Sequence, residues 1–136
     1  KQNAGSIQLT FFDIFSDKTK QFGFKAVFPS GKILTCLGDE PFNEKCRNFV
    51  QNCDYLMCEA FCLYSQKDIF KPYEKFHSTA LDAGKLAESL FAKNLILYHT
   101  EDETLQTRKS TYTSEARTVF NGNIFVPDDF GVIDLK

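Results

Sequence analysis

A short apolar run that ends in a histidine does most to limit the folds open to this chain. Residues 95–98 are apolar without polar relief, as expected of a strand buried on both faces, and His99 follows directly. Before this run, residues 80–91 place their apolar side chains at helical spacing. Thr79, with Asp82 three residues later, resembles a capping box at the start of that helix. A helix that leads into a buried strand is typical of a layered α/β fold.

Two further apolar runs also lead to a polar side chain. Residues 33–37 lead to Asp39, and residues 54–58 lead to Glu59. The other histidine of the chain, His77, lies just before the predicted helix. Layered α/β folds bind their ligands outside the carboxyl ends of the strands. The candidates for a functional site are therefore Asp39, Glu59, His77 and His99.

The remaining segments predict a sheet layered with helices. Alternating apolar residues and turn signals indicate strands, and helical spacing indicates helices. We expect residues 1–5 to fray. The other expected elements are a strand at 6–16, a hairpin at 22–37, a helix from Pro41 to about Gln51, a strand at 54–59, a loop with a helical turn at 61–76, the helix from residue 80, the strand at 95–98, a surface helix at 103–119, and short strands at 124–126 and 132–135.

Composition limits the class of protein. The 136 residues are 43% apolar, which is ample for the core of one domain or of part of a larger one. A net charge of -2 does not support an electrostatic grip on RNA or DNA. The phenylalanines follow strand patterns without interleaved arginine, so we expect them in the core and not on a base-stacking platform. No apolar run is long enough for a membrane span, and five cysteines without a secretory signal favour a reduced, cytoplasmic protein.

Four motifs carry a resemblance to a known family. They are, in chain order, Gly38-Asp39, Cys58-Glu59-Ala60-Phe61, His77-Ser78-Thr79 and Leu95-Ile96-Leu97-Tyr98-His99. This ordered set resembles the C-terminal half of a metallo-β-lactamase-fold hydrolase of the ribonuclease Z-like branch, over about residues 6–136. The resemblance implies an α/β (α+β) fold that is half of an αββα sandwich, with a mixed sheet and helices on one face. Residues 1–136 would form a single domain.

The resemblance also implies roles for the four candidate residues. Asp39 would bridge two metal ions and His99 would bind one of them, with zinc expected and manganese or iron as alternatives. Glu59 would pair with His77, which would help the leaving group to depart. A dinuclear site of this kind activates water for ester hydrolysis, and the resemblance favours phosphodiesters.

The chain departs from the family pattern in ways that limit this interpretation. The His-x-His-x-Asp-His signature, which supplies most of the metal ligands, is absent. Because the chain opens at Lys1 and its single methionine is Met57, we expect it to be part of a longer polypeptide whose N-terminal half carries that signature. The chain alone should then be inactive. Residues 100–103 replace the family's Phe-Ser-x-Arg-Tyr run, and no glycine-rich arm is present. These departures argue against tRNA 3′-end processing but not against hydrolysis, and RNA stays a possible partner that the charge does not support.

The sequence leaves several alternatives open. The chain could instead be a non-catalytic half-fold module that binds or regulates another chain. Its partner would be the missing half of the fold or a second copy, because half a sandwich exposes the inner face of its sheet. Asp39 could merely cap the helix after it, and Glu59 with His77 could form a structural hydrogen bond. The acids at 101–103 could be a solvated helix start, or could select the charge of a substrate.

Overall fold

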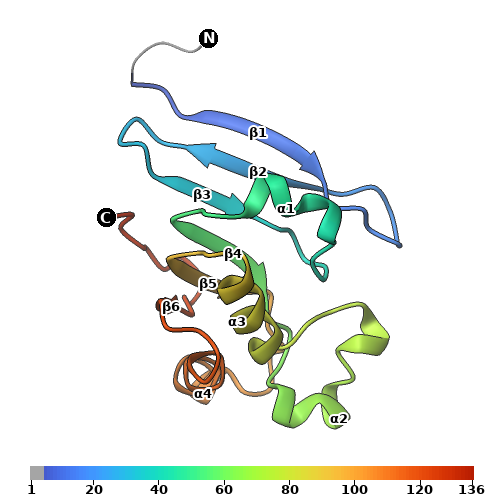
Figure 1. The fold of residues 1–136 in the computed structure, drawn as a ribbon. Coiled ribbons are helices and arrows are strands. Elements are labelled where there is room, and N and C mark those ends of the chain that lie inside the picture. Colours follow the sequence, from blue (N-terminus) through green and yellow to red (C-terminus); the bar gives the residue numbers. More distant parts are fainter. Residues whose placement is uncertain (1–4) are drawn as a thin grey trace.

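The computed structural model describes residues 5–136 and contains one mixed sheet whose strands follow the chain order (Figure 1). The first three strands pair antiparallel, and the third to the sixth pair parallel. The strands are β1 (Gln8–Asp13), β2 (Phe22–Val27), β3 (Ile33–Cys36), β4 (Tyr55–Glu59), β5 (Asn94–Tyr98) and β6 (Asn123–Phe125). The α-helices are α1 (Arg47–Val50), α2 (Lys67–Phe70), α3 (Ala80–Ser89) and α4 (Leu105–Arg117), and the 3₁₀ helices are η1 (Glu44–Cys46), η2 (Tyr64–Gln66) and η3 (Tyr73–Lys75).

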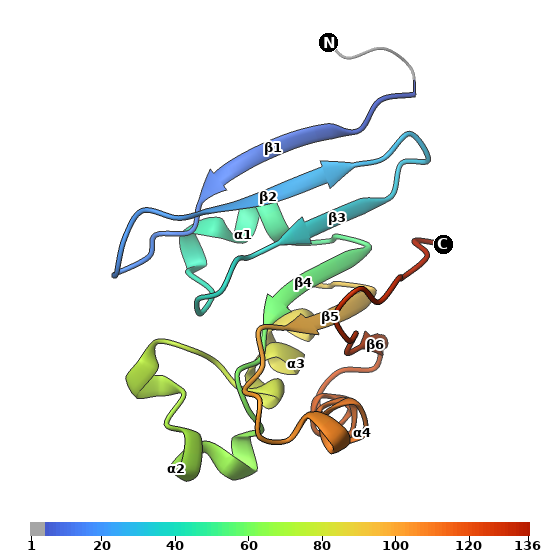
Figure 2. The same cartoon turned by 180° about the vertical axis from the view of Figure 1, so that it is seen from behind.

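The helices that connect the parallel strands gather on one face of the sheet. Crossovers between parallel strands are right-handed, so a strand order that advances in one direction puts successive helices on the same side. Figures 1 and 2 show α1 and α3 on that side, with α4 beside α3, while α2 lies in a lobe that extends away from the sheet. The predicted fold class, a mixed sheet with helices on one face, is therefore confirmed.

The core lies between α3 and the central parallel strands. Leu56 and Leu95 of the sheet and Ala83 and Ala87 of α3 are almost fully buried in one apolar cluster. Small side chains let α3 approach closely, and a Cβ atom on Gly84 would come within 2.9 Å of the carbonyl oxygen of Ala116 in α4. The capping box predicted at the start of α3 is present, with both reciprocal hydrogen bonds.

The opposite face of the sheet carries an apolar row that crosses all six strands. Side chains alternate between the two faces of a strand, so the neighbours of the core residues point away from the helices. Phe11 in this row is 66% exposed, which shows that the expectation of phenylalanines only in the core was wrong. By strand register, the row consists of Phe11, Phe24, Cys36, Met57, Ile96 and Phe125.

Some predicted boundaries were wrong for identifiable reasons. Asn43 caps η1 by accepting a hydrogen bond from the Lys45 amide, so the helix expected from Pro41 starts only at Glu44. The first strand ends at Asp13, whose carboxylate accepts from the Phe15 amide in a turn. Residues 1–4 of the stretch expected to fray lie outside the described residues.

The C-terminal residues form no strand. The predicted strand at 132–135 is wrong, because these residues pair with no strand among residues 5–136, and Val132 is 88% exposed. These residues instead cross the open face of the sheet near β5 and β6, as Figure 2 shows from behind. The Tyr55 hydroxyl holds them there, since it accepts from the Lys136 amide at 3.1 Å.

The acidic run before α4 contains one buried carboxylate. Glu101 is 6% exposed and accepts hydrogen bonds from the Glu103 and Thr104 amides and from the Tyr112 hydroxyl. It therefore satisfies free amides at the start of α4. The acids at 101–103 could form a solvated helix start, and this interpretation fits Asp102 and Glu103, which are exposed. Glu101, which is buried, has a structural role.

Candidate active site

The fold brings the four predicted residues to one edge of the sheet. Glu59 is the last residue of β4, His99 follows β5, and Asp39 lies three residues after β3. The carboxyl ends of parallel strands meet at the same edge, which places these side chains near one another. His77, just before α3, completes the group, with its ring centroid 5.1 Å from that of His99. The charge of Asp39 acts on both Glu59 and His77.

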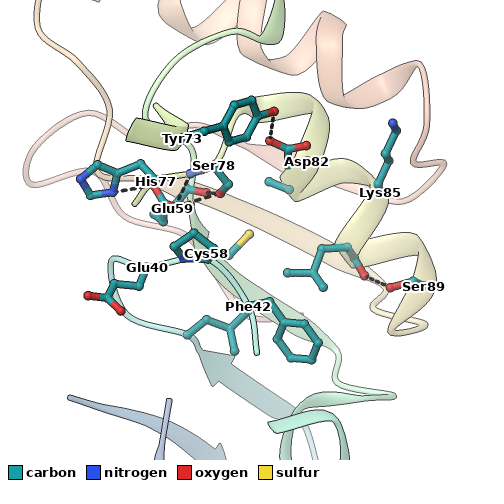
Figure 3. Close-up of a pocket in the computed structure, with 14 residues that line it drawn as sticks. Glu40, Phe42, Cys58, Glu59, Tyr73, His77, Ser78, Asp82, Lys85 and Ser89 are labelled. Atoms are coloured by element: carbon teal, nitrogen blue, oxygen red, sulfur yellow. Dashed lines mark hydrogen bonds and ion pairs between the residues drawn. The ribbon is translucent and has the colours of Figure 1, made fainter. Parts of the chain in front are cut away.

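Glu59 and His77 face each other in a buried pair (Figure 3). Nδ1 of His77 lies 3.3 Å from Oε2 of Glu59, whose side chain is 1% exposed. The other carboxylate oxygen, Oε1, accepts from the amide of Ser78 at 2.6 Å and from its hydroxyl at 2.9 Å. Neither Nδ1 of His77 nor Oε2 of Glu59 has a well-formed hydrogen bond to any other atom of residues 5–136. Ser78 therefore fixes the carboxylate with its free oxygen turned toward the imidazole.

Burial disfavours the charged forms of both partners. It raises the pKa of the Glu59 carboxyl to about 7, against the lowering effect of the Ser78 hydrogen bonds, and the charges of Asp39 and Asp82 raise it further. It also lowers the pKa of His77, as do the charges of His99 and Lys18. Although the distance would suit an ion pair, both shifts favour a neutral pair. Near neutral pH the two residues hold one transferable proton, as acid–base catalysis requires.

A largely apolar pocket explains the raised pKa of Glu59. It has a volume of about 440 Å³ and lies between α3 and the loop after β3, with Glu59 and His77 at one end (Figure 3). Its walls include Leu37, Phe42 and Leu86. An apolar wall cannot solvate a carboxylate, so the protonated form of Glu59 is favoured.

The backbone and one tyrosine set the relative positions of Asp39 and His99. Gly38, at a φ of 78°, and His99, at a φ of 57°, are both left-handed, so the chain turns sharply at the ends of β3 and β5. The Tyr98 hydroxyl donates to the Gly38 carbonyl and lies 3.4 Å from Sγ of Cys36. Because β4 lies between β3 and β5, this side chain ties together two strands that are not neighbours.

The described residues supply only part of a metal site. Within residues 5–136, no three histidine, cysteine, aspartate or glutamate side chains are grouped closely enough to hold a metal ion. A carboxylate and an imidazole, as in Asp39 and His99, are donors that zinc accepts, but a closed zinc site needs four. As donors, Asp39 and His99 fit the metal ions that the resemblance implies, but two donors do not complete a metal site.

No helix in the described part of the chain is long and apolar enough to cross a lipid bilayer.

Two contributors to this geometry were not predicted. Ser78 and Tyr98 each adjoin a predicted histidine, and that adjacency was the only signal that could have pointed to them. Their roles depend on hydrogen bonds to residues 19 and 60 positions away. No periodicity in the sequence reports such contacts.

The relatives in sequence are ribonucleases Z. No protein-family model matches the chain. Ribonuclease Z of Bacillus cereus (strain AH187) is 34% identical over 98 residues, which are 72% of this chain and 31% of the relative. Ribonuclease Z of Bacillus thuringiensis (strain Al Hakam) is 32% identical over the same shares. The chain thus spans about a third of the length of the curated relatives that it matches.

The relatives in structure share the fold. The metallo-β-lactamase-fold protein YhfI of Bacillus subtilis matches 96% of this chain with a TM-score of 0.75 and 20% identity, over 50% of its own length. The short form of human tRNase Z matches 99% of this chain with a TM-score of 0.71 and 24% identity, over 44% of its own length. The chain is therefore a ribonuclease Z-like protein of the metallo-β-lactamase fold, and it spans part of that fold.

Proposed function

We propose that this chain carries part of the active site of a metal-dependent hydrolase that cleaves phosphodiesters. The observation that carries the proposal is the buried Glu59–His77 pair beside His99, at the edge where the parallel strands end. The ribonuclease Z relatives support a phosphodiester as substrate. Since the chain spans a third of their length, the activity is proposed for a polypeptide that also contains the remaining ligands.

Each candidate residue has a distinct proposed task. Asp39 and His99 would hold metal, with Asp39 bridging two ions, zinc in the first place and manganese or iron as alternatives. Bound metal of this kind supplies a water whose pKa is lowered toward neutrality. Glu59 orients the His77 imidazole, and His77 delivers the proton of the pair to the departing oxygen. The apolar pocket keeps that proton available near neutral pH, and Ser78 holds the Glu59 carboxyl group in place.

The rest of the fold is the partner that this proposal requires. The apolar row on the open face of the sheet would pack against the N-terminal half of an αββα sandwich, which would bring the missing ligands. A second copy of the chain could cover the same face in a homodimer. Small phosphodiesters or other esters would be the substrates. All five cysteines are free thiols, which supports a reducing compartment such as the cytoplasm.

A second candidate function rests on the same apolar row. A chain that kept the fold without completing the metal site would act as a binding or regulatory module, pairing with another chain through this face. The exposed Phe11 favours such a contact. This candidate predicts a stable complex and no hydrolysis.

The two candidates are separated by a metal-dependent assay. A polypeptide that contains this chain and the remaining ligands should hydrolyse bis(p-nitrophenyl) phosphate after loading with Zn²⁺, Mn²⁺ or Fe²⁺, and should lose the activity on chelation. Metal removal should return the rate to background because the activated water is lost. A folded protein that hydrolyses nothing with any of the three metals would reject the enzyme and favour the module.

A further inference from the structure

Two lysines near His77 each lie over a phenylalanine ring. Nζ of Lys75 is 5.1 Å from the centroid of Phe61, and the Phe61 ring also stacks on His77 at 5.0 Å. Nζ of Lys18 is 5.7 Å from the centroid of Phe76, the residue before His77. An aromatic face attracts an ammonium group and limits its motion. The two cations therefore lie over rings next to the proposed proton donor: Phe76 precedes His77 in the chain, and Phe61 stacks on it.

The segments that carry these lysines are held in place. Lys18 lies in the loop between β1 and β2, where the Glu40 carboxylate accepts from the Ser16 hydroxyl at 2.6 Å and from the side-chain amide of Gln21 at 3.2 Å. Glu40 directly follows Asp39, so this loop is tied to the segment of a proposed metal ligand.

Lys75 ends η3, which is fixed at both sides. The His77 amide donates to the Pro72 carbonyl at 2.9 Å, and the Tyr73 hydroxyl donates to Asp82 of α3 at 2.7 Å. These contacts hold the backbone at Lys75 in a fixed position relative to His77.

Neither ammonium group is neutralised by a carboxylate. Four other lysines, Lys20, Lys67, Lys93 and Lys109, form ion pairs. Within residues 5–136, Lys18 and Lys75 form none, although Asp17 and Glu74 adjoin them in sequence. Both lysines are exposed. The charge of Lys18 also reaches the site, since it contributes to lowering the pKa of His77. Exposed, unpaired ammonium groups are suited to phosphate oxygens.

We propose that Lys18 and Lys75 bind phosphate groups beside the scissile one, so that the substrate carries more than one phosphate. This inference rests on the proposed hydrolysis of phosphodiesters and specifies its substrate. A single phosphodiester would occupy only the edge at Asp39 and His99, whereas two cations on different segments suit two further anionic groups. The ligand chemistry is a chain of phosphates, supplied either by a single-stranded nucleic acid or by a small nucleotide with a pyrophosphate.

A binding experiment on the chain itself tests this inference without metal. Fluorescence anisotropy would follow a fluorescein-labelled hexauridylate at low salt, with EDTA present. The double variant Lys18→Gln, Lys75→Gln should bind at least about 10-fold more weakly. The slope of log K against log salt should fall by about 1.4, because each lysine that neutralises a phosphate of a single strand contributes about 0.7. Circular dichroism melting would confirm that the variants fold.

Lys67→Gln is the matched control. Lys67 also lies over a ring, 5.0 Å from the centroid of Tyr64, but it pairs with Asp68. Tyr64 lies on the α4 side of the lobe, where its amide donates to Glu115. This variant should bind like the unaltered chain. An equal loss of affinity in the control, no loss in the double variant, or no binding at all would overturn the inference.

Competition identifies the source of the phosphates. Displacement of the probe by ATP, dependent on the two lysines, assigns a small nucleotide, and displacement only by unlabelled hexauridylate assigns a strand. Either outcome supports the two-lysine site. Lysine-dependent binding in a protein that hydrolyses nothing would reject the proposed catalysis alone, and hydrolysis without lysine dependence would reject this inference alone.

Discussion

Replacing His77 with alanine is expected to slow phosphodiester hydrolysis by the metal-loaded protein by about 10²- to 10⁴-fold, the usual contribution of a positioned acid. The loss should appear in kcat, because the proton is transferred in the transition state, with little change in KM. Within the described residues, the imidazole is the group that faces Oε2 of Glu59, so its removal leaves this carboxylate oxygen without its partner. The measurement is steady-state kinetics on esters with an alkyl and with a p-nitrophenyl leaving group.

The two leaving groups distinguish an acid from a merely structural histidine. An alkoxide needs a proton in order to depart, whereas p-nitrophenolate departs readily without one, so the alkyl ester should suffer much more. The metal content of the His77→Ala protein should be unchanged, since Asp39 and His99 remain. Equal losses for both esters, or loss of metal, would show that His77 supports the site in another way.

Replacing Glu59 with glutamine is expected to stabilise the fold at pH 8 by up to about 3 kcal/mol, the free energy that corresponds to a shift of this size. A free glutamate titrates near 4.5, but burial keeps Glu59 protonated until about 7. Between these values the folded state binds more protons than the unfolded state. The stability of the unaltered chain should therefore fall as the pH rises from 4.5 to 7, and then level off.

Glutamine removes this dependence and keeps the hydrogen bonds. Its carbonyl oxygen can still accept from Ser78, and its amide can donate toward His77. Urea unfolding at pH 4.5, 6 and 8 measures the effect, with Glu103→Gln at an exposed position as the matched control. If Glu59→Gln is less stable at every pH, the carboxylate is present for structural reasons. The predicted gain would show instead that the fold retains a destabilising group, as active sites often do.

Features fixed by neighbouring residues could be predicted from the sequence. The capping box of Thr79 and Asp82 depends on residues three apart, and the buried strand after it depends on a continuous apolar run. Both are local signals with a direct physical cause. The convergence of Asp39, Glu59 and His99 follows from one further rule, that parallel strands end at a common edge.

Features fixed by distant contacts could not be predicted. Val132 belongs to an apolar pattern typical of a strand, yet no sheet edge pairs with it. Glu101 is one of three acids that look alike in sequence, and only its burial against Tyr112 distinguishes it. Lys18 approaches His77 because Glu40 holds its loop, a contact that spans 24 residues. Such contacts depend on tertiary packing, which sequence periodicity does not report.

The proposed active site is tested most directly by metal content. Elemental analysis would compare the polypeptide that contains this chain and the remaining ligands with its Asp39→Asn and His99→Gln variants, and with His77→Gln as a control. We predict that the unaltered protein and the control hold two metal ions, that each ligand variant loses at least one, and that hydrolysis is lost with the metal. Full metal content and full activity in both ligand variants would contradict the assignment of Asp39 and His99, and with it the proposed active site.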